Sequence, residues 1–399
     1  MSNETDIALL KAAACEGLNV IEELIDKGAN LWFCDNNGIT ALHLVTARGR
    51  LDLMEFLIAR GANHGAVDGT GWTPLFFACA QGHLQAIELL KTSGANFELV
   101  DVHGMTPLHL AAHNGHTEVA RLLVDEGLAV DHKSEEGLTA LHCTARQGFF
   151  NTVDFLLQAG AEVDGVDDNG WTPLHYASDQ GHTNVAILLL DRGAKVDSSA
   201  TYQAGTTKKG SFGWTPMHLA CSSGHEAIVR ELVARHAPLE SETEDGVRPL
   251  HCAAIAGDAA VAAFLLAEGA FALARTNNAW TPLLFANVTG KVDVVGLLLE
   301  NSACLLEKNE GGQNALHIAA MNGHFELVSF LLEKGAKVED GDGLEWTALH
   351  WAADRGHQKV IETLLAAGAK PGTKDTYGKT AQEVAEKAGF NELLELLQP

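Results

Sequence analysis

The stretch from Gly170 to His182 reads GWTPLHYASDQGH and packs two histidines, an aspartate, a serine and a tyrosine into thirteen residues. Taken alone, this composition is typical of part of a hydrolase or metal site. The same stretch also suits a short helix, because Thr172 can cap it, Pro173 fits a first helical position that needs no N–H, and Gly181 can end it. Apolar residues at helical spacing predict a second helix over about 182–191. The rest of the chain decides between a site and a structural unit.

The glycine that opens this stretch recurs every 33 residues, at Gly38, Gly71, Gly104, Gly137 and Gly170. After one longer step the series resumes at the same interval, at Gly213, Gly246, Ala279, Gly312, Glu345 and Gly378. The chain around these positions repeats one pattern, as in GITALHL, GMTPLHL, GLTALHC, GWTPMHL and EWTALHW. The stretch is therefore a repeated structural unit. Where alanine and glutamate replace the glycine, we expect local strain or an altered turn if the position requires a positive φ.

The pattern resembles the ankyrin repeat, which has a 33-residue period and a T-P-L-H-x-A signature. The resemblance implies an all-α solenoid of stacked helix-turn-helix units with hairpin-like loops, curved with a concave binding face. About twelve units cover nearly the whole chain. We expect an N-terminal capping repeat over 1–37, repeats 2 to 6 over 38–197, a loop insertion over 198–212, repeats 7 to 11 over 213–377, and a C-terminal capping repeat over 378–399.

Composition narrows the function classes. The chain has 399 residues, of which 46% are hydrophobic and 20% are charged, as in ordinary folded proteins. Its net charge of −25 repels nucleic acid and anionic membranes and favours basic partners. No basic start precedes an apolar run, and no apolar run approaches the ~18 residues of a membrane span, so we expect a cytoplasmic or nuclear monomer. Seven scattered cysteines without a CxxC pair predict neither a disulfide framework nor a zinc site.

Histidines are the main candidates for chemistry, and most of them follow the repeat. Of the 19, eight occupy the T-P-L-H position: His43, His109, His142, His175, His218, His251, His317 and His350. Six follow the glycine between the two helices: His83, His116, His182, His225, His324 and His357. The resemblance implies that these are structural and bond neighbouring loops and helices. No nucleotide-binding motif occurs, so we expect no catalytic residue, no metal and no cofactor.

Function is then expected of a surface. The resemblance places loop tips and first helices along a concave groove, and we assign the residue after the repeat glycine to the tip. This predicts partner-binding residues at Trp72, Met105, Leu138, Trp171, Trp214, Trp280 and Trp346. The alternative is that these side chains pack against the neighbouring loop, and the two interpretations are compatible. Nearby groove positions add His113, Arg146 and Asp179.

The insertion is a second candidate region. It contains Lys208 and Lys209, a basic pair in an acidic chain, and is interpreted either as a neutral extension or as a finger that contacts or gates the partner. Its serines and threonines are also candidate phosphorylation sites. The resemblance further suggests the asparagines of the GAN turns as hydroxylation targets: Asn30, Asn63 and Asn96.

These observations favour a non-enzymatic protein-interaction scaffold or adaptor that binds a protein or extended peptide, with basic segments, in its groove. The alternative is a dedicated inhibitor or regulatory subunit of a single enzyme. An adaptor should recover several proteins, whereas an inhibitor should recover one stoichiometric partner whose activity it changes.

Overall fold

The computed structural model describes residues 2–15, 17–200 and 213–398. Within this part of the chain it contains 23 α-helices, one 3₁₀ helix and a single isolated β-bridge between Cys34 and Thr40. The residues form two compact units. Unit 1 comprises the described residues up to 195, and unit 2 comprises 196–200 and the described residues from 213 onward. Each unit has its own core.

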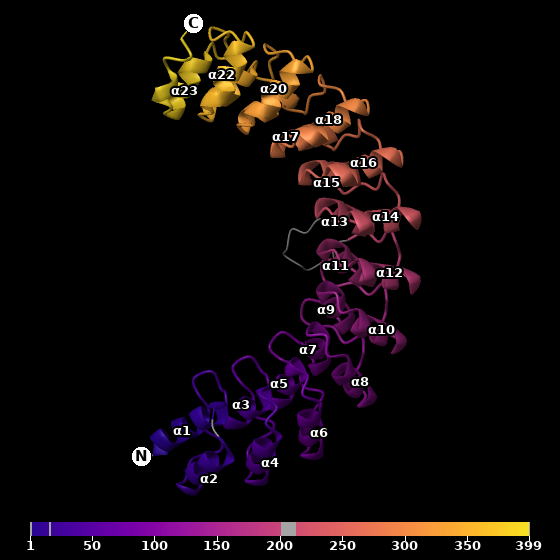
Figure 1. Ribbon diagram of the computed structural model, residues 1–399, viewed down its shortest axis with the longest axis vertical. Helices are drawn as coiled ribbons and strands as arrows, with labels where there is room; N and C mark the ends of the chain where they lie inside the picture. The colour runs from indigo at the N-terminus through magenta and orange to yellow at the C-terminus, as the bar shows by residue number, and fades with distance from the viewer. Residues whose placement is uncertain (1, 16, 201–212, 399) are drawn as a thin grey trace. The chain divides into compact units, whose positions relative to one another are not determined.

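Unit 1 consists of six pairs of helices (Figure 1). Its helices are α1 (Ser2–Cys15), α2 (Leu18–Asp26), α3 (Ala41–Ala47), α4 (Leu51–Ala59), α5 (Pro74–Gln81), α6 (Leu84–Thr92), α7 (Pro107–His113), α8 (Thr117–Asp125), α9 (Ala140–Gln147), α10 (Phe150–Gln158), α11 (Pro173–Gln180) and α12 (Thr183–Asp191). Each odd-numbered first helix packs on the next first helix, and the second helices line up behind them, as Figure 1 shows.

Unit 2 repeats this arrangement. Its helices are α13 (Pro216–Ser222), α14 (Glu226–Ala234), α15 (Pro249–Ala256), α16 (Ala259–Ala267), α17 (Pro282–Thr289), α18 (Val292–Glu300), α19 (Ala315–Met321), α20 (Phe325–Glu333), α21 (Ala348–Asp354), α22 (Gln358–Ala366), α23 (Ala381–Ala388) and the 3₁₀ helix η1 (Asn391–Leu393). The predicted all-α fold of stacked helix-turn-helix units is confirmed. The capping roles of the terminal units stay predictions.

The local signals of the opening stretch act as the sequence predicts. Thr172 is the N-cap of α11, Pro173 is its first residue, and Gly181 is its C-cap with a φ of 78° in the left-handed region. The Thr172 hydroxyl lies 2.8 Å from Nδ1 of His175, which also accepts the backbone N–H of Thr172 at 3.0 Å. The first turn of the helix is thus closed by its own histidine.

Histidines of the T-P-L-H position also join neighbouring repeats. Nε2 of His109 donates to the carbonyl of Leu138 at 2.9 Å, and Nε2 of His218 donates to the carbonyl of Val247 at 3.0 Å. A carbonyl oxygen can only accept, so the ring proton is on Nε2. Nδ1 is then free to accept the backbone N–H three residues earlier, as Nδ1 of His109 does from Thr106 at 3.1 Å. The predicted structural role of these histidines is confirmed.

The loop between repeats is a hairpin closed by an Asx turn. Gly104 N–H donates to the Asp101 carbonyl, and Oδ1 of Asp101 accepts the N–H groups of His103 and Met105, each at 2.9 Å. The tip is therefore formed by the residues before the glycine, whereas the residue after it lies on the returning arm. This corrects the sequence-based assignment of the tip by two to three residues. Neighbouring tips bond through backbone groups within each unit, as when His103 accepts from Glu135 at 2.8 Å.

The insertion starts and ends within one of these hairpins. Ala200 N–H donates to the Trp214 carbonyl and Gly213 N–H donates to the Ala200 carbonyl, each at 2.8 Å. These are the two bonds that Asp167 makes with Trp171 and Gly170 in the preceding hairpin. The described residues on either side of the insertion, Ala200 and Gly213, thus keep the hydrogen bonds of the ordinary hairpin.

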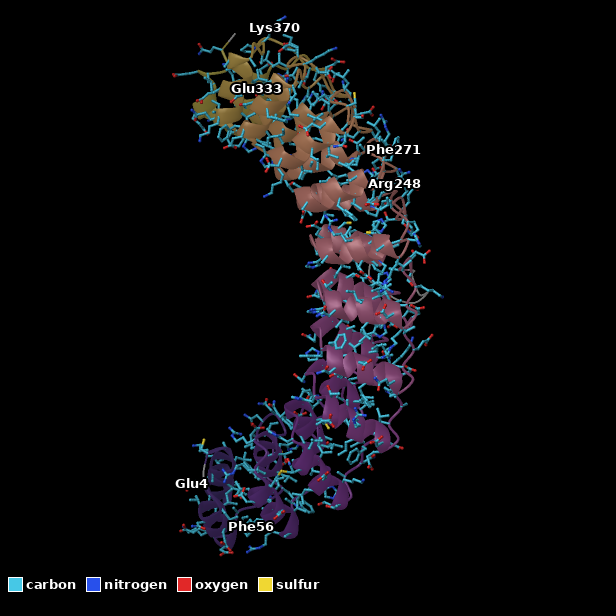
Figure 2. The ribbon with its side chains drawn as sticks, turned by 45° about the vertical axis from the view of Figure 1, so that its right-hand side comes forward. Glu4, Phe56, Arg248, Phe271, Glu333 and Lys370 are labelled. Atoms are coloured by element: carbon cyan, nitrogen blue, oxygen red, sulfur yellow. The ribbon has the colours of Figure 1, made fainter. Side chains whose placement is uncertain are left out.

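Residues that depart from the repeat pattern either adopt an unfavourable backbone conformation or form other contacts. Ala279 and Glu345 have φ values of 58° and 57°, so the turn position is in the left-handed region even where the glycine is replaced, and the backbone conformation is kept at the cost of an unfavourable φ. Arg248, which is labelled in Figure 2, replaces the capping threonine of α15. Its guanidinium instead binds Glu240 and Glu242, with N–O distances of 2.9 and 2.5 Å.

Candidate functional site

The residues after the repeat glycine have mainly structural contacts. Nε1 of Trp72 donates to Oδ2 of Asp101 in the next hairpin at 3.0 Å, and Trp346 does the same to Asp375 at 3.0 Å. Trp171 lies against the ring of Tyr176, with centroids 5.1 Å apart. Similar ring contacts hold Trp280 on Phe285 and Trp214 on His218. All five indoles are half-buried, so each leaves part of its surface open to a ligand.

A hollow of about 510 Å³ lies in unit 1, between the fourth and fifth repeats. It brings together four of the predicted partner-binding residues, which are Met105, His113, Leu138 and Arg146. We call it the unit 1 hollow. The remaining lining residues are His103, Ser134, Glu135, Glu136, His142 and Cys143.

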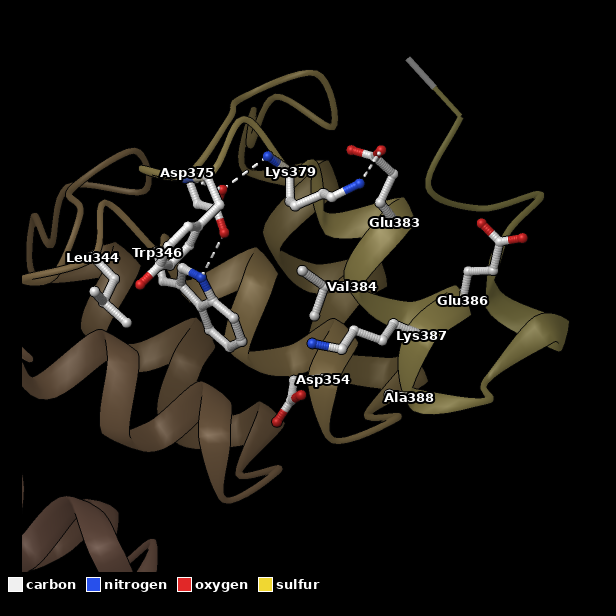
Figure 3. A pocket seen from close by; sticks show the side chains of 11 residues that line it. Leu344, Trp346, Asp354, Asp375, Lys379, Glu383, Val384, Glu386, Lys387 and Ala388 are labelled. Carbon is white, nitrogen blue, oxygen red and sulfur yellow. Dashed lines mark hydrogen bonds and ion pairs between the residues drawn. The ribbon is translucent and has the colours of Figure 1, made fainter.

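A second hollow, of about 670 Å³, lies in unit 2 between the last two repeats (Figure 3). It contains one predicted residue, Trp346, and we call it the unit 2 hollow. The other lining residues are Leu344, Asp354, Asp375, Tyr377, Lys379, Glu383, Val384, Glu386, Lys387 and Ala388.

Both hollows are built from the same positions of the repeat. The ends of two neighbouring first helices supply His113 and Arg146 in unit 1. The matching residues in unit 2, 33 positions apart in the same way, are Asp354 and Lys387. The returning arms, the hairpin tips and further residues of the later of these two first helices, α9 or α23, supply the rest. One structural template thus presents different chemistry in the two units.

The other predicted residues lie outside these hollows. Trp72, Trp171 and Asp179 belong to unit 1 but line neither hollow, and Trp214 and Trp280 are likewise separate in unit 2. Asp179 is half-buried. Lys208 and Lys209 fall outside the described residues, as does most of the insertion. The GAN asparagines are exposed, and their side chains cap their own turns: Asn30, Asn63 and Asn96.

Sequence reasoning missed several lining residues because it placed the tip after the glycine. His103 and Glu136 immediately precede the repeat glycine in unit 1, and Leu344 and Tyr377 hold the same position in unit 2. Leu344 is 45% exposed and Tyr377 is 74% exposed. A change from the usual small or polar residue at this position to an apolar or aromatic one is the signal that would have identified Leu344 and Tyr377.

His142 and Cys143 line the unit 1 hollow side by side, but they do not form a nucleophilic pair. Burial raises the pKa of the Cys143 thiol to about 12, so it stays protonated at neutral pH. Burial also lowers the pKa of His142, whose Nε2 donates to the carbonyls of Gly165 and Trp171. In the described part of the chain, no group of three or more His, Cys, Asp or Glu residues is arranged to hold a metal ion.

Comparison with known families agrees with this geometry. Models described as ankyrin repeats in three copies match 9–101, 44–134, 87–167, 126–200, 201–277, 237–309 and 271–342, and a single ankyrin repeat matches 344–376. The chain belongs to the ankyrin-repeat family. Such repeats indicate a protein–protein interaction scaffold, and the family is typically non-enzymatic. No curated protein matches the chain. Among the described residues, no helix is long and apolar enough to cross a bilayer.

Proposed function

We propose that this protein is a non-enzymatic scaffold or adaptor whose groove face binds an extended segment of a partner protein that carries basic residues. The observation that supports the proposal most strongly is the unit 1 hollow. Four residues chosen from the sequence as contacts, from two neighbouring repeats, line one cavity there. A cavity of this size accepts one or two side chains of a peptide.

The chemistry of the unit 1 hollow favours an apolar anchor with a basic neighbour. Met105 and Leu138 are half-buried and supply an apolar floor. Glu135 and Glu136 are exposed at the hairpin tip and form an acidic rim. The guanidinium of Arg146 lies over the Tyr176 ring, 6.0 Å from its centroid, and adds a positive charge at the other edge. The net charge of −25 for the whole chain also attracts a basic partner and speeds its association at low salt.

Affinity capture from native lysate with the cross-linked full chain tests the proposal. The Met105→Ala/Leu138→Ala variant should retain the helical circular dichroism spectrum and lose affinity for the captured partner by more than about 2 kcal/mol, roughly 30-fold. Phe150→Ala is the matched control, because it removes an exposed apolar side chain from the second helix α10. Equal binding by the wild type and the double variant would move the site elsewhere.

The same experiment separates the two functional classes. Several unrelated partners that compete for the groove support an adaptor. One stoichiometric enzyme whose turnover changes on binding supports the alternative, a dedicated inhibitor or regulatory subunit. The monomeric state and the cytoplasmic or nuclear location stay predictions.

A further inference from the structure

The unit 2 hollow is surrounded by more negative than positive charge. Its lining contains four carboxylates and two ammonium groups. One of the ammonium groups, on Lys379, is already paired with Glu383 at 2.9 Å. Asp375 is held in its ionised form: burial raises its pKa, but hydrogen bonds from the Lys379 N–H and the Trp346 indole N–H outweigh this, and the net pKa is lowered.

The second ammonium group, on Lys387, lies in the hollow itself. Figure 3 shows its side chain extending from α23 across the hollow toward Asp354 and Trp346. Asp354 is the last residue of α21 and occupies the same repeat position as Lys387. Asp354 also forms a partly exposed ion pair with its neighbour Arg355, whose Nε lies 3.3 Å from Oδ2. The chain therefore places one of its own cations in the hollow that Trp346 and Asp354 line.

Aromatic and apolar side chains make this environment specific. The Trp346 indole is half-buried, and Tyr377 is 74% exposed at the adjacent tip. A planar guanidinium stacks on such rings and forms two parallel hydrogen bonds with a carboxylate, whereas an ammonium is a strongly hydrated point charge. Arginine matches this combination better than lysine does.

The row of helix ends that leads to Asp354 is apolar. In the three preceding repeats of unit 2, the residues at this position are Ile255, Val288 and Met321. Ile255 is 38% exposed, and Val288 and Met321 are half-buried. A bound segment would thus meet apolar surface before it reaches the carboxylate.

We propose that the unit 2 hollow binds an arginine side chain of the partner, which displaces the ammonium group of Lys387 from the hollow lined by Asp354 and Trp346. Lys387 acts as an internal competitor that weakens binding of other cations. The inference rests on the proposed function, because it names the chemical group of the partner that the unit 2 hollow recognises.

Fluorine NMR of the full chain labelled with 5-fluorotryptophan tests this inference, with Trp346→Phe assigning the resonance. The probe is N-acetyl-argininamide, and the control is the corresponding citrulline amide, which has nearly the same shape without the charge. The arginine probe should shift the Trp346 resonance saturably, and the citrulline probe should not. Equal shifts with both probes, or no shift at Trp346, would overturn the proposal.

Removing a negative or a positive charge from the hollow should change the affinity for the arginine probe in opposite directions. Asp354→Asn should weaken binding of the arginine probe by about threefold to fivefold, in line with a partly exposed ion pair. Lys387→Met should strengthen binding by a similar factor. Lys370→Met is the matched control, since it removes the same charge from an exposed site of unit 2 outside the hollow, marked in Figure 2. If Lys387→Met binds no more tightly than Lys370→Met, net charge alone explains the effect and the proposal is wrong.

The outcome is independent of the test of the proposed function. Saturable arginine binding at Trp346 without any captured protein contradicts the scaffold function and supports the arginine site. A partner that binds through Met105 and Leu138, in a protein whose Trp346 resonance ignores arginine, supports the scaffold function and contradicts the arginine site.

Discussion

Five of the repeats contain two framework histidines with different hydrogen-bond partners. The histidine of the T-P-L-H position, such as His109, closes its own helix and donates to the next hairpin. The histidine after the inter-helix glycine, such as His116, donates through Nε2 to a carbonyl of the preceding repeat, here Ala80 at 3.0 Å. Both are structural contacts. The histidines that first suggested a hydrolase or metal site are thus used to hold the repeats together.

Stability should fall in acid because of the first histidine set. Burial lowers the pKa of His109, His218 and His251 from 6.5 to about 4. Below about pH 6.5 these histidines are therefore protonated in the unfolded chain but stay neutral in the folded chain. Their contribution to the free energy of unfolding is complete above pH 6.5 and is lost as the pH falls toward 4. It amounts to about 1.4 kcal/mol per unit of pKa difference for each residue.

Urea unfolding at pH 7.5, 6, 5 and 4.5 measures this effect. The unfolding midpoint should decrease steadily below pH 6.5, and His109→Gln should show a smaller decrease than the wild type. A midpoint that does not change between pH 7.5 and 4.5 would mean that the buried imidazoles do not govern stability.

At the scale of the element, the turn between the two helices of a repeat depends on a glycine. Gly82 ends α5 with a φ of 76°, and a Cβ added there would lie 2.6 Å from Nδ1 of His116 in the next repeat. Gly148 has the same relation to His182, with a distance of 2.5 Å. The position thus needs glycine both for its backbone conformation and for the close approach of the neighbouring ring.

Two substitutions separate these reasons. Gly94→Ala introduces a side chain at a φ of 88° with nothing within 4 Å, so it should cost only the left-handed penalty of roughly 1–2 kcal/mol. Gly82→Ala should cost clearly more, because the His116 ring must also move. The free energy of unfolding of both variants, and of Gly82→Ala/His116→Ala, measures the difference. Equal costs for the two single variants would show that the ring contact is unimportant.

At the scale of the whole molecule, the described chain forms two units that each bury their own core. Leu123 in unit 1 and Leu232 in unit 2 are both completely buried. Because repeat stability comes from contacts between neighbours, each unit should behave as a cooperative block.

We accordingly expect urea to unfold the chain in two steps. Leu123→Ala and Leu232→Ala should each lower one step, by about 2–5 kcal/mol, and leave the other step in place. Circular dichroism, together with the fluorescence of Trp72 and Trp280 retained singly, follows the two units separately. If one variant shifts both steps equally, the units unfold as a single block.

Local signals in the sequence were enough to predict the fold. Helix caps, the inter-helix glycine and the apolar spacing are local signals, and they predicted α11 and α12 to within one residue. Repetition of these signals at 33 residues then implied the stacking of neighbours. The framework histidines could be recognised for the same reason, since a residue that recurs at the same position in most units serves the unit.

Contacts between side chains of different repeats could not be predicted in this way. The hollows depend on the sizes of side chains in adjacent repeats, which pack against one another across 33 residues and leave a gap where they do not fill the space. The tip position was likewise settled by the Asx turn at Asp101, whose hydrogen bonds place His103 at the tip and Met105 on the returning arm. Lys387 lines the unit 2 hollow because α23 places it toward Asp354 of the neighbouring first helix. The repeat period predicts that these two positions are neighbours, but it does not predict that their side chains share a hollow.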